Sequence, residues 1–84
     1  MYMYIGQGTV LETEDVIGIF DLDITSQSHI TRAFLSSAEK KGAVVNASED
    51  IPRSFLLSCE DGSEKVYLCQ PSTATLLRRA ENGI

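Results

Sequence analysis

The 84-residue sequence predicts a small α+β fold, a mixed domain with an antiparallel sheet of about five strands and two helices. Three observations indicate this class. Several short segments alternate apolar and polar residues, two longer segments repeat apolar residues at helical spacing, and glycine or proline separates them. The expected order is β-β-β-α-(β)-β-β-α, with a short strand in parentheses. The length predicts a single domain spanning residues 1–84.

The N-terminal part is predicted to form a hairpin followed by a third strand. Residues 1–5 alternate, residues 6–8 (Gly-Gln-Gly) form a turn, and residues 9–12 return as the second strand. The apolar run of residues 16–20 contains β-branched side chains and predicts a buried central strand. Gly18 within this run predicts that a helix or another backbone approaches closely.

Residues 28–41 are predicted to form the first helix. Thr25 and Ser26 are its candidate N-caps, and Gly42 is well placed to end it. Residues 43–45 then predict the short strand. The packing stripe of the helix recurs at helical spacing and consists of Ile30, Ala33, Phe34, Ser37, Ala38 and Lys41.

The last third of the chain predicts a hairpin and a second helix. A two-residue turn at Asp61-Gly62 joins strands at residues 55–59 and 65–69. The pairing places Phe55, Leu57, Val66 and Leu68 on one face and Leu56, Tyr67 and Cys69 on the other, so both faces are expected to be covered. Ser72 is a candidate N-cap for a helix of residues 73–81, and Gly83 can end it.

The two cysteines, Cys59 and Cys69, are predicted to be reduced. With the two-residue turn, Cys59 pairs with Glu64 and Cys69 with Ser54. The two sulfurs then lie about five residues apart along the ladder, roughly 16 Å at the usual strand rise. This separation is far beyond disulfide distance. A turn of three or four residues would change these partners.

The composition bounds the possible functions. The net charge of -5 counts against binding to nucleic acid or to an anionic membrane surface. A local basic patch could still bind an anion, because salt screens the charges that lie far from it. The N-terminus lacks the basic and long apolar regions of a secretory signal, and no stretch is long and apolar enough to span a membrane. The expected location is the cytoplasm, with no membrane partner.

No enzyme, cofactor or metal site is predicted. His29 is the single histidine and has no cysteine or second histidine nearby, so neither a zinc site nor a nucleophile–base pair is indicated. The neighbouring carboxylates Asp21 with Asp23, and Glu49 with Asp50, are expected in solvated turns. The Gly-Gln-Gly turn of residues 6–8 lacks the lysine and the following helix of a phosphate-binding loop.

Three arginines are the candidate contacts for phosphate. Arg53 precedes the main hairpin, while Arg78 and Arg79 are adjacent near the end of the last helix. The same side chains can instead form ion pairs with Glu81, Glu49 or Asp50, and both interpretations stay open. Tyr2 and Tyr4 share one face of the first strand, where they either enter the core or form an oligomer contact.

Two blocks of the sequence together resemble a bacterial family. The opening MYMYIGQGTVLETEDVIGIFDL, with the later segments IPRSFLLS and VYLCQPSTATLLRR, is similar to RemB-type extracellular matrix regulators. The resemblance covers most of the chain except roughly residues 25–50. It implies regulation of biofilm matrix genes, and the related RemA proteins are DNA-binding transcription regulators that assemble into rings. Where those relatives carry a basic residue ahead of the third strand, this chain has Glu14-Asp15.

The resemblance and the arginines together predict a non-enzymatic protein that regulates the transcription of extracellular matrix genes. It is expected to act as a bacterial cytoplasmic homo-oligomer that associates with double-stranded DNA through Arg53, Arg78 and Arg79. The alternative is a protein–protein interaction module that acts through a partner regulator without touching DNA. The charge of -5 favours this alternative.

Overall fold

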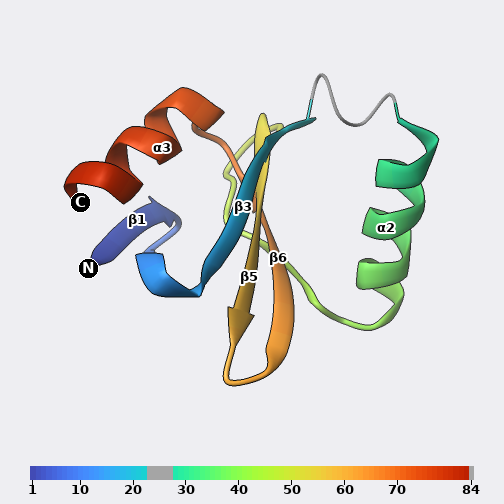
Figure 1. The fold of residues 1–84 in the computed structure, drawn as a ribbon. Helices are drawn as coiled ribbons and strands as arrows, with labels where there is room; N and C mark the ends of the chain where they lie inside the picture. Colours follow the sequence, from blue (N-terminus) through green and yellow to red (C-terminus); the bar gives the residue numbers. More distant parts are fainter. Residues whose placement is uncertain (23–27, 84) are drawn as a thin grey trace.

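The computed structural model describes residues 1–22 and 28–83. A four-stranded sheet stands between two flanking layers, with a hairpin and the C-terminal helix on one side and the other helix on the opposite side (Figure 1). The elements are β1 (Tyr2–Gly6), β2 (Thr9–Glu12), the 3-10 turn η1 (Thr13–Asp15), β3 (Val16–Asp21), α2 (His29–Lys40), β4 (Val44–Asn46), β5 (Ser54–Glu60), β6 (Ser63–Cys69) and α3 (Thr73–Asn82).

The α+β class and the order of elements are confirmed, while the arrangement of the strands differs from a single antiparallel sheet. The six strands form two sheets: β1 pairs only with β2, and the larger sheet has the order β3-β5-β6-β4. The short strand β4 pairs with β6 in parallel. The β5–β6 hairpin lies between β3 and β4, so these two strands lie at the edges of the larger sheet.

The prediction that residues 16–20 form a buried central strand is wrong. Among the described residues, β3 is an edge strand whose one neighbour is β5, and Ile17 is 59% exposed. The close approach expected at Gly18 comes from neither a helix nor another backbone. A Cβ at Gly18 would lie 2.8 Å from two ring carbons of Phe20, which folds back over the glycine and stacks on Phe55 with ring centroids 4.9 Å apart.

The predicted register of the main hairpin is confirmed. Asp61 and Gly62 both have positive φ, 52° and 83°, as a two-residue turn of this kind requires. Cys59 pairs with Glu64 and Cys69 with Ser54, and both cysteines are free thiols.

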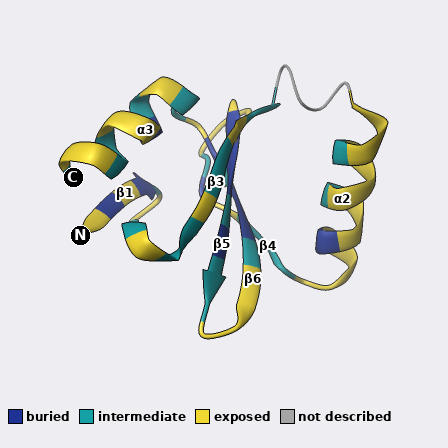
Figure 2. Ribbon diagram, viewed as in Figure 1, coloured by how far each residue is buried: buried dark blue, intermediate teal, exposed yellow. Residues whose placement is uncertain are grey.

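Each face of the β5–β6 hairpin supports its own hydrophobic cluster, and Figure 2 shows the deepest burial along these strands. Met3 and Ile5 of β1 and Leu76 of α3 have no exposed surface and cover the first face. The buried members on the α2 side are Ala38, Phe55 and Val66. The sheet therefore separates two cores, of which the α3 side is the larger.

The helices begin at serine caps. Ser28 Oγ accepts a hydrogen bond from Thr31 N (3.4 Å) at the start of α2, while the candidate caps Thr25 and Ser26 lie outside the described residues. Ser72 caps α3 as predicted, accepting from Thr75 N at 3.3 Å. Gly42 follows α2 with φ of 72°, a conformation that glycine adopts without strain.

The buried thiol of Cys69 and the buried phenol of Tyr67 lead us to expect a loss of stability at high pH. Burial raises the pKa of the Cys69 thiol to about 11, and burial together with the neighbouring Glu60 raises the pKa of Tyr67 to about 12. Because both pKa values are higher in the folded state, their stabilising contributions are complete below the unfolded values and are lost as the pH rises through the folded ones.

We expect the urea midpoint to fall between about pH 8 and about pH 10.5, and the Cys69→Ala variant to show a smaller fall over this range. Cys59→Ala is the matched control, since Cys59 is only half-buried. Equal pH dependence in wild type and Cys69→Ala would contradict the role of the buried thiol.

Candidate functional site

The three arginines predicted to contact phosphate lie on two elements. Arg53 directly precedes β5, and its backbone is fixed on both sides: its N–H donates to Cys69 O (2.9 Å) and its carbonyl accepts from Leu22 N (3.0 Å). Its side chain is exposed. The structure thus presents this guanidinium from a rigid position where the ends of β3 and β6 meet the start of β5.

Arg78 lies in the second half of α3 and is exposed. It follows the cap residue Ser72 by six positions, about 9 Å along the helix axis. The start of α3 lies at the same end of the sheet as the start of β5 (Figure 1). The starts of β5 and α3 therefore share one end of the sheet, and Arg78 lies further along α3 from that end.

Neither of these two side chains is engaged within the described part of the chain. Across residues 1–22 and 28–83, the guanidinium groups of Arg53 and Arg78 form no ion pair or hydrogen bond. The alternative in which they pair with Glu81, Glu49 or Asp50 is not realised among those residues. Within residues 1–22 and 28–83, nothing therefore occupies these two guanidinium groups.

Arg79 has a different environment, which the sequence did not reveal. Its Nη1 donates a hydrogen bond to Tyr4 O (2.9 Å), and its guanidinium carbon lies 5.7 Å from the centroid of the Tyr4 ring. The contact joins α3 to β1 across 75 positions in sequence. Arg79 thus fastens the terminal helix to the first strand, while using one of the five N–H donors of its guanidinium.

The two tyrosines of β1 point away from the core. Tyr2 is 56% exposed and Tyr4 is 36% exposed, whereas Met3 and Ile5 between and beyond them are fully buried. Tyr4 is covered by Arg79 rather than by an apolar helix face. The suggestion that the tyrosines enter the core is therefore wrong, and their exposed faces are compatible with an oligomer contact.

A hydrogen-bonded carboxylate in the hairpin was also missed by sequence reasoning. Tyr67 and Ser58 donate their hydroxyl protons to Glu60 Oε2 at 2.7 and 2.8 Å, and these two bonds lower the pKa of Glu60. Ser58 and Glu60 are two positions apart on one strand, so they share a face, which is the one signal that could have indicated the contact. The arrangement satisfies the polar groups at the border of the core.

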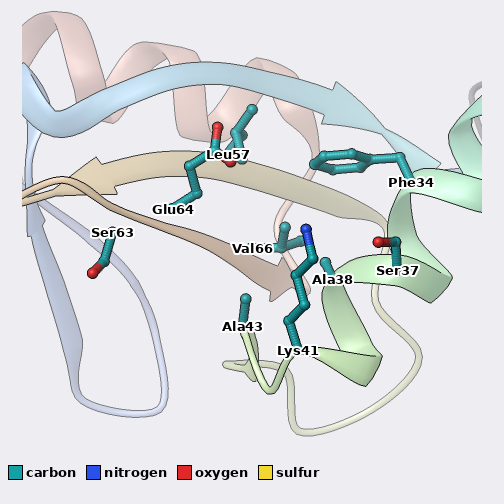
Figure 3. Close-up of a pocket in the computed structure, with 9 residues that line it drawn as sticks. All are labelled: Phe34, Ser37, Ala38, Lys41, Ala43, Leu57, Ser63, Glu64 and Val66. Atoms are coloured by element: carbon teal, nitrogen blue, oxygen red, sulfur yellow. The ribbon is translucent and has the colours of Figure 1, made fainter.

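Several hollows lie on the surface of the described residues. One lies between α2 and the β5–β6 hairpin and has a volume of about 320 Å³. It is lined by apolar side chains, such as Phe34 and Val66, and by polar ones that include Lys41 and Glu64 (Figure 3). Another, of about 220 Å³, adjoins Arg79. His29 is exposed and lines neither of them.

Two other kinds of site are absent from the described residues. Among residues 1–22 and 28–83, no three histidine, cysteine or acidic side chains lie together as metal ligands. In the same part of the chain, no helix is both long and apolar enough to cross a membrane. Asp23, one member of a candidate carboxylate pair, lies outside the described residues.

Comparison with known proteins identifies a relative along nearly the whole chain. No protein-family model matches the sequence. The chain is 31% identical over 81 residues to extracellular matrix regulatory protein B of Bacillus subtilis (strain 168), and the match covers 96% of this chain and 91% of the relative. The similarity thus extends well into the segment of residues 25–50 that the two recognised blocks leave out. With this identity over nearly the full length of both proteins, the chain belongs to the family of extracellular matrix regulatory protein B.

Proposed function

We propose that this protein is a non-enzymatic regulator of extracellular matrix gene expression that acts in the cytoplasm as a homo-oligomer and contacts double-stranded DNA. Arg53 and Arg78 are the principal phosphate contacts. The observation that carries the proposal is that the side chains of Arg53 and Arg78 are exposed and that neither guanidinium group is engaged within the described residues. Arg79 adds a third positive charge in a position fixed by Tyr4.

The acidic balance of the chain determines how such binding has to work. With a net charge of -5, one subunit gains little from long-range attraction to DNA. An oligomer repeats the same pair of arginines once per subunit, and linked weak contacts raise the overall affinity. Binding is therefore expected to depend both on assembly and on salt.

Fluorescence anisotropy with an AT-rich DNA duplex at several salt concentrations tests the proposal. Wild type is expected to bind at low salt, with an affinity that falls steeply as salt increases, because phosphate contacts release counterions. Arg53→Ala/Arg78→Ala is expected to lose binding by at least about tenfold. Lys65→Ala, which removes a cation near the hairpin turn at the other end of the sheet, is the control and is expected to bind as wild type does.

Arg79 is tested separately, because its substitution also removes the contact to β1. Arg79→Lys keeps the charge while losing the fork geometry, so it distinguishes phosphate binding from the structural contact. If a folded, oligomeric wild type binds no duplex even at low salt, the DNA contact is wrong.

The second candidate is a protein–protein interaction module that acts through a partner regulator. The net charge of -5 favours it, since a protein partner with a basic surface suits an acidic chain better than DNA does. The same anisotropy experiment decides between the two: absence of DNA binding by folded protein favours the module.

A further inference from the structure

A hollow of about 440 Å³ lies between β3 and α3. Residues 16–19 of β3 form one wall, and Leu77, Ala80 and Glu81 of α3 line the other. Ile17 and Leu77 are 59% and 54% exposed, although both side chains are large and apolar. Large apolar side chains that gather around one hollow indicate a surface that another molecule covers.

The outer side of β3 offers backbone groups beside this hollow. Leu22 N donates to Arg53 O at 3.0 Å, so this pair is hydrogen-bonded between the two strands. Because bonded and non-bonded pairs alternate in an antiparallel ladder, Phe20 also bonds to β5, and the N–H and C=O of Ile19 point away from β5. Among the described residues, β5 is the one strand that pairs with β3. An extended segment can therefore hydrogen-bond to Ile19 while its side chains cover the hollow.

A register shift affects only the first half of β3. The pairing with β5 skips Ile17, which has no partner in the ladder, and it is regular from Gly18 to Asp21. Such an irregularity protects the start of an edge strand against pairing. The shift thus leaves Ile17 to act through its side chain and Ile19 to act through its backbone.

The margin of the hollow is acidic. Glu81 lines it, and Glu14 and Asp15 come directly after Thr13, which lines it as well. Among the described residues, no lysine or arginine contributes to the lining. Within residues 1–22 and 28–83, the three carboxylates form no ion pair. We call Glu14, Asp15 and Glu81 the acidic rim.

The acidic rim and the apolar walls together define the chemistry of the molecule that fits. Duplex DNA is disfavoured, because its phosphates carry the same sign of charge as the rim. Side chains alternate between the two faces of a strand, so every second residue of an added segment would face the hollow. Apolar β-branched residues at those positions would cover Ile17 and Leu77. Lysine or arginine at the ends of the segment would complement the rim.

A second copy of this chain fits the same surface less well. Each copy has a net charge of -5, so two copies repel one another near the acidic rim. A twofold contact between two β3 strands is antiparallel and brings Asp15 of one copy toward Asp21 of the other. Like charges opposite each other on paired strands are destabilising. The charges therefore favour a different protein with a basic segment.

We propose that the hollow between β3 and α3 binds a short extended segment of another protein, with alternating apolar side chains and basic ends. The segment adds a strand to β3 at Ile19, covers Ile17 and Leu77, and places its basic residues at the acidic rim. The inference goes beyond the proposed function, because it assigns a second surface that acts whether or not the arginines contact DNA.

Fluorescence anisotropy with labelled synthetic peptides tests this site. The probe is KKVTVTVKK. One control, EEVTVTVEE, keeps the centre and reverses the charge, and the other, KKVTPTVKK, has a central proline that lacks a backbone donor. We expect the basic probe to bind with an affinity that falls as salt increases, and both controls to bind at least about tenfold more weakly. Equal binding of the three peptides, or no binding of the probe by folded protein at low salt, would overturn the proposal.

Charge variants test the acidic rim. Glu14→Gln/Glu81→Gln removes two of its charges and is expected to reduce the preference for the basic over the acidic peptide by at least about threefold. Glu39→Gln/Glu64→Gln is the matched control, since it removes two exposed charges on the α2 side of the sheet, and it is expected to keep the preference. Equal effects of the two double variants would show that net charge attracts the peptide, and the site would be overturned.

A substitution in the apolar wall tests the position of the peptide. Ile17→Lys is expected to weaken binding of the probe by at least about tenfold while leaving the fold intact, since Ile17 is 59% exposed. Ile51→Lys adds the same charge at a loop position that is 79% exposed and does not line the hollow, so near wild-type binding is expected. Circular dichroism shows whether each variant is folded. Unchanged binding by folded Ile17→Lys would overturn the proposed position.

Two comparisons separate this site from the DNA contact and from self-association. Arg53→Ala/Arg78→Ala is expected to lose DNA binding and to bind the probe at least as well as wild type does, so either idea can fail without the other. Loss of probe binding in that variant would overturn the separate surface. If wild type binds no probe and Ile17→Lys lowers the oligomeric mass in light scattering, a second copy occupies the edge and the proposal is overturned.

Discussion

Replacing Leu76 with alanine is expected to lower the free energy of unfolding by about 2–5 kcal/mol, a large fraction of the total for a domain of this size. Leu76 has no exposed surface and is the buried residue through which α3 packs on the sheet and β1. The truncation removes apolar contact and leaves a cavity between three elements that cannot all move inward. Urea denaturation followed by circular dichroism measures the change.

Ile51→Ala provides the control for this prediction. It removes the same number of carbon atoms from a side chain that is 79% exposed, so it is expected to change the free energy of unfolding by no more than about 0.5 kcal/mol. Similar losses in the two variants would show that the α3 side of the sheet is not the main core.

The second large effect is expected at Gly6, where alanine should cost more than about 2 kcal/mol of stability. Gly6 has φ of 132°, and a Cβ placed there would lie 2.5 Å from the carbonyl oxygen of Ala47. Both the backbone conformation and the contact with buried Ala47 oppose a side chain. The β1–β2 hairpin would have to move away from the segment after β4, and the covering of the α3-side core would loosen.

Gly8→Ala separates the two causes. Gly8 also has positive φ, 72°, but a Cβ there would have no neighbour within 4 Å. Its substitution is therefore expected to cost only about 1–2 kcal/mol, the penalty of the left-handed conformation alone. Thermal unfolding of both variants tests the difference, and equal costs would mean that the contact with Ala47 does not restrict Gly6.

The sequence predicted best where local chemistry determines the structure. The turn at Asp61-Gly62 fixes the register of the main hairpin, and the serine at position 72 starts α3, because both depend on neighbouring residues. The position of β3 could not be obtained in this way. An apolar run of β-branched residues looks the same at the edge of a sheet as at its centre, and only the placement of the β5–β6 hairpin decides between them.

The same distinction between local and long-range determinants applies to the candidate site. Exposed arginines at element ends could be expected from the sequence, since charge and position are local properties. The contact of Arg79 with Tyr4 could not, because it joins residues 75 positions apart and depends on β1 lying under α3.

Because the sheet separates the two cores, the two sides of the molecule are expected to differ in local stability. α2 has one buried residue, Ala38, and hollows lie between it and the sheet, whereas α3 is anchored by Leu76 and by Arg79. We therefore expect α2 to open locally at a lower free energy than α3, with the larger cluster still closed. Substitutions on the α2 face are accordingly expected to cost less stability than substitutions of buried residues on the α3 side, whose packing keeps the fold intact.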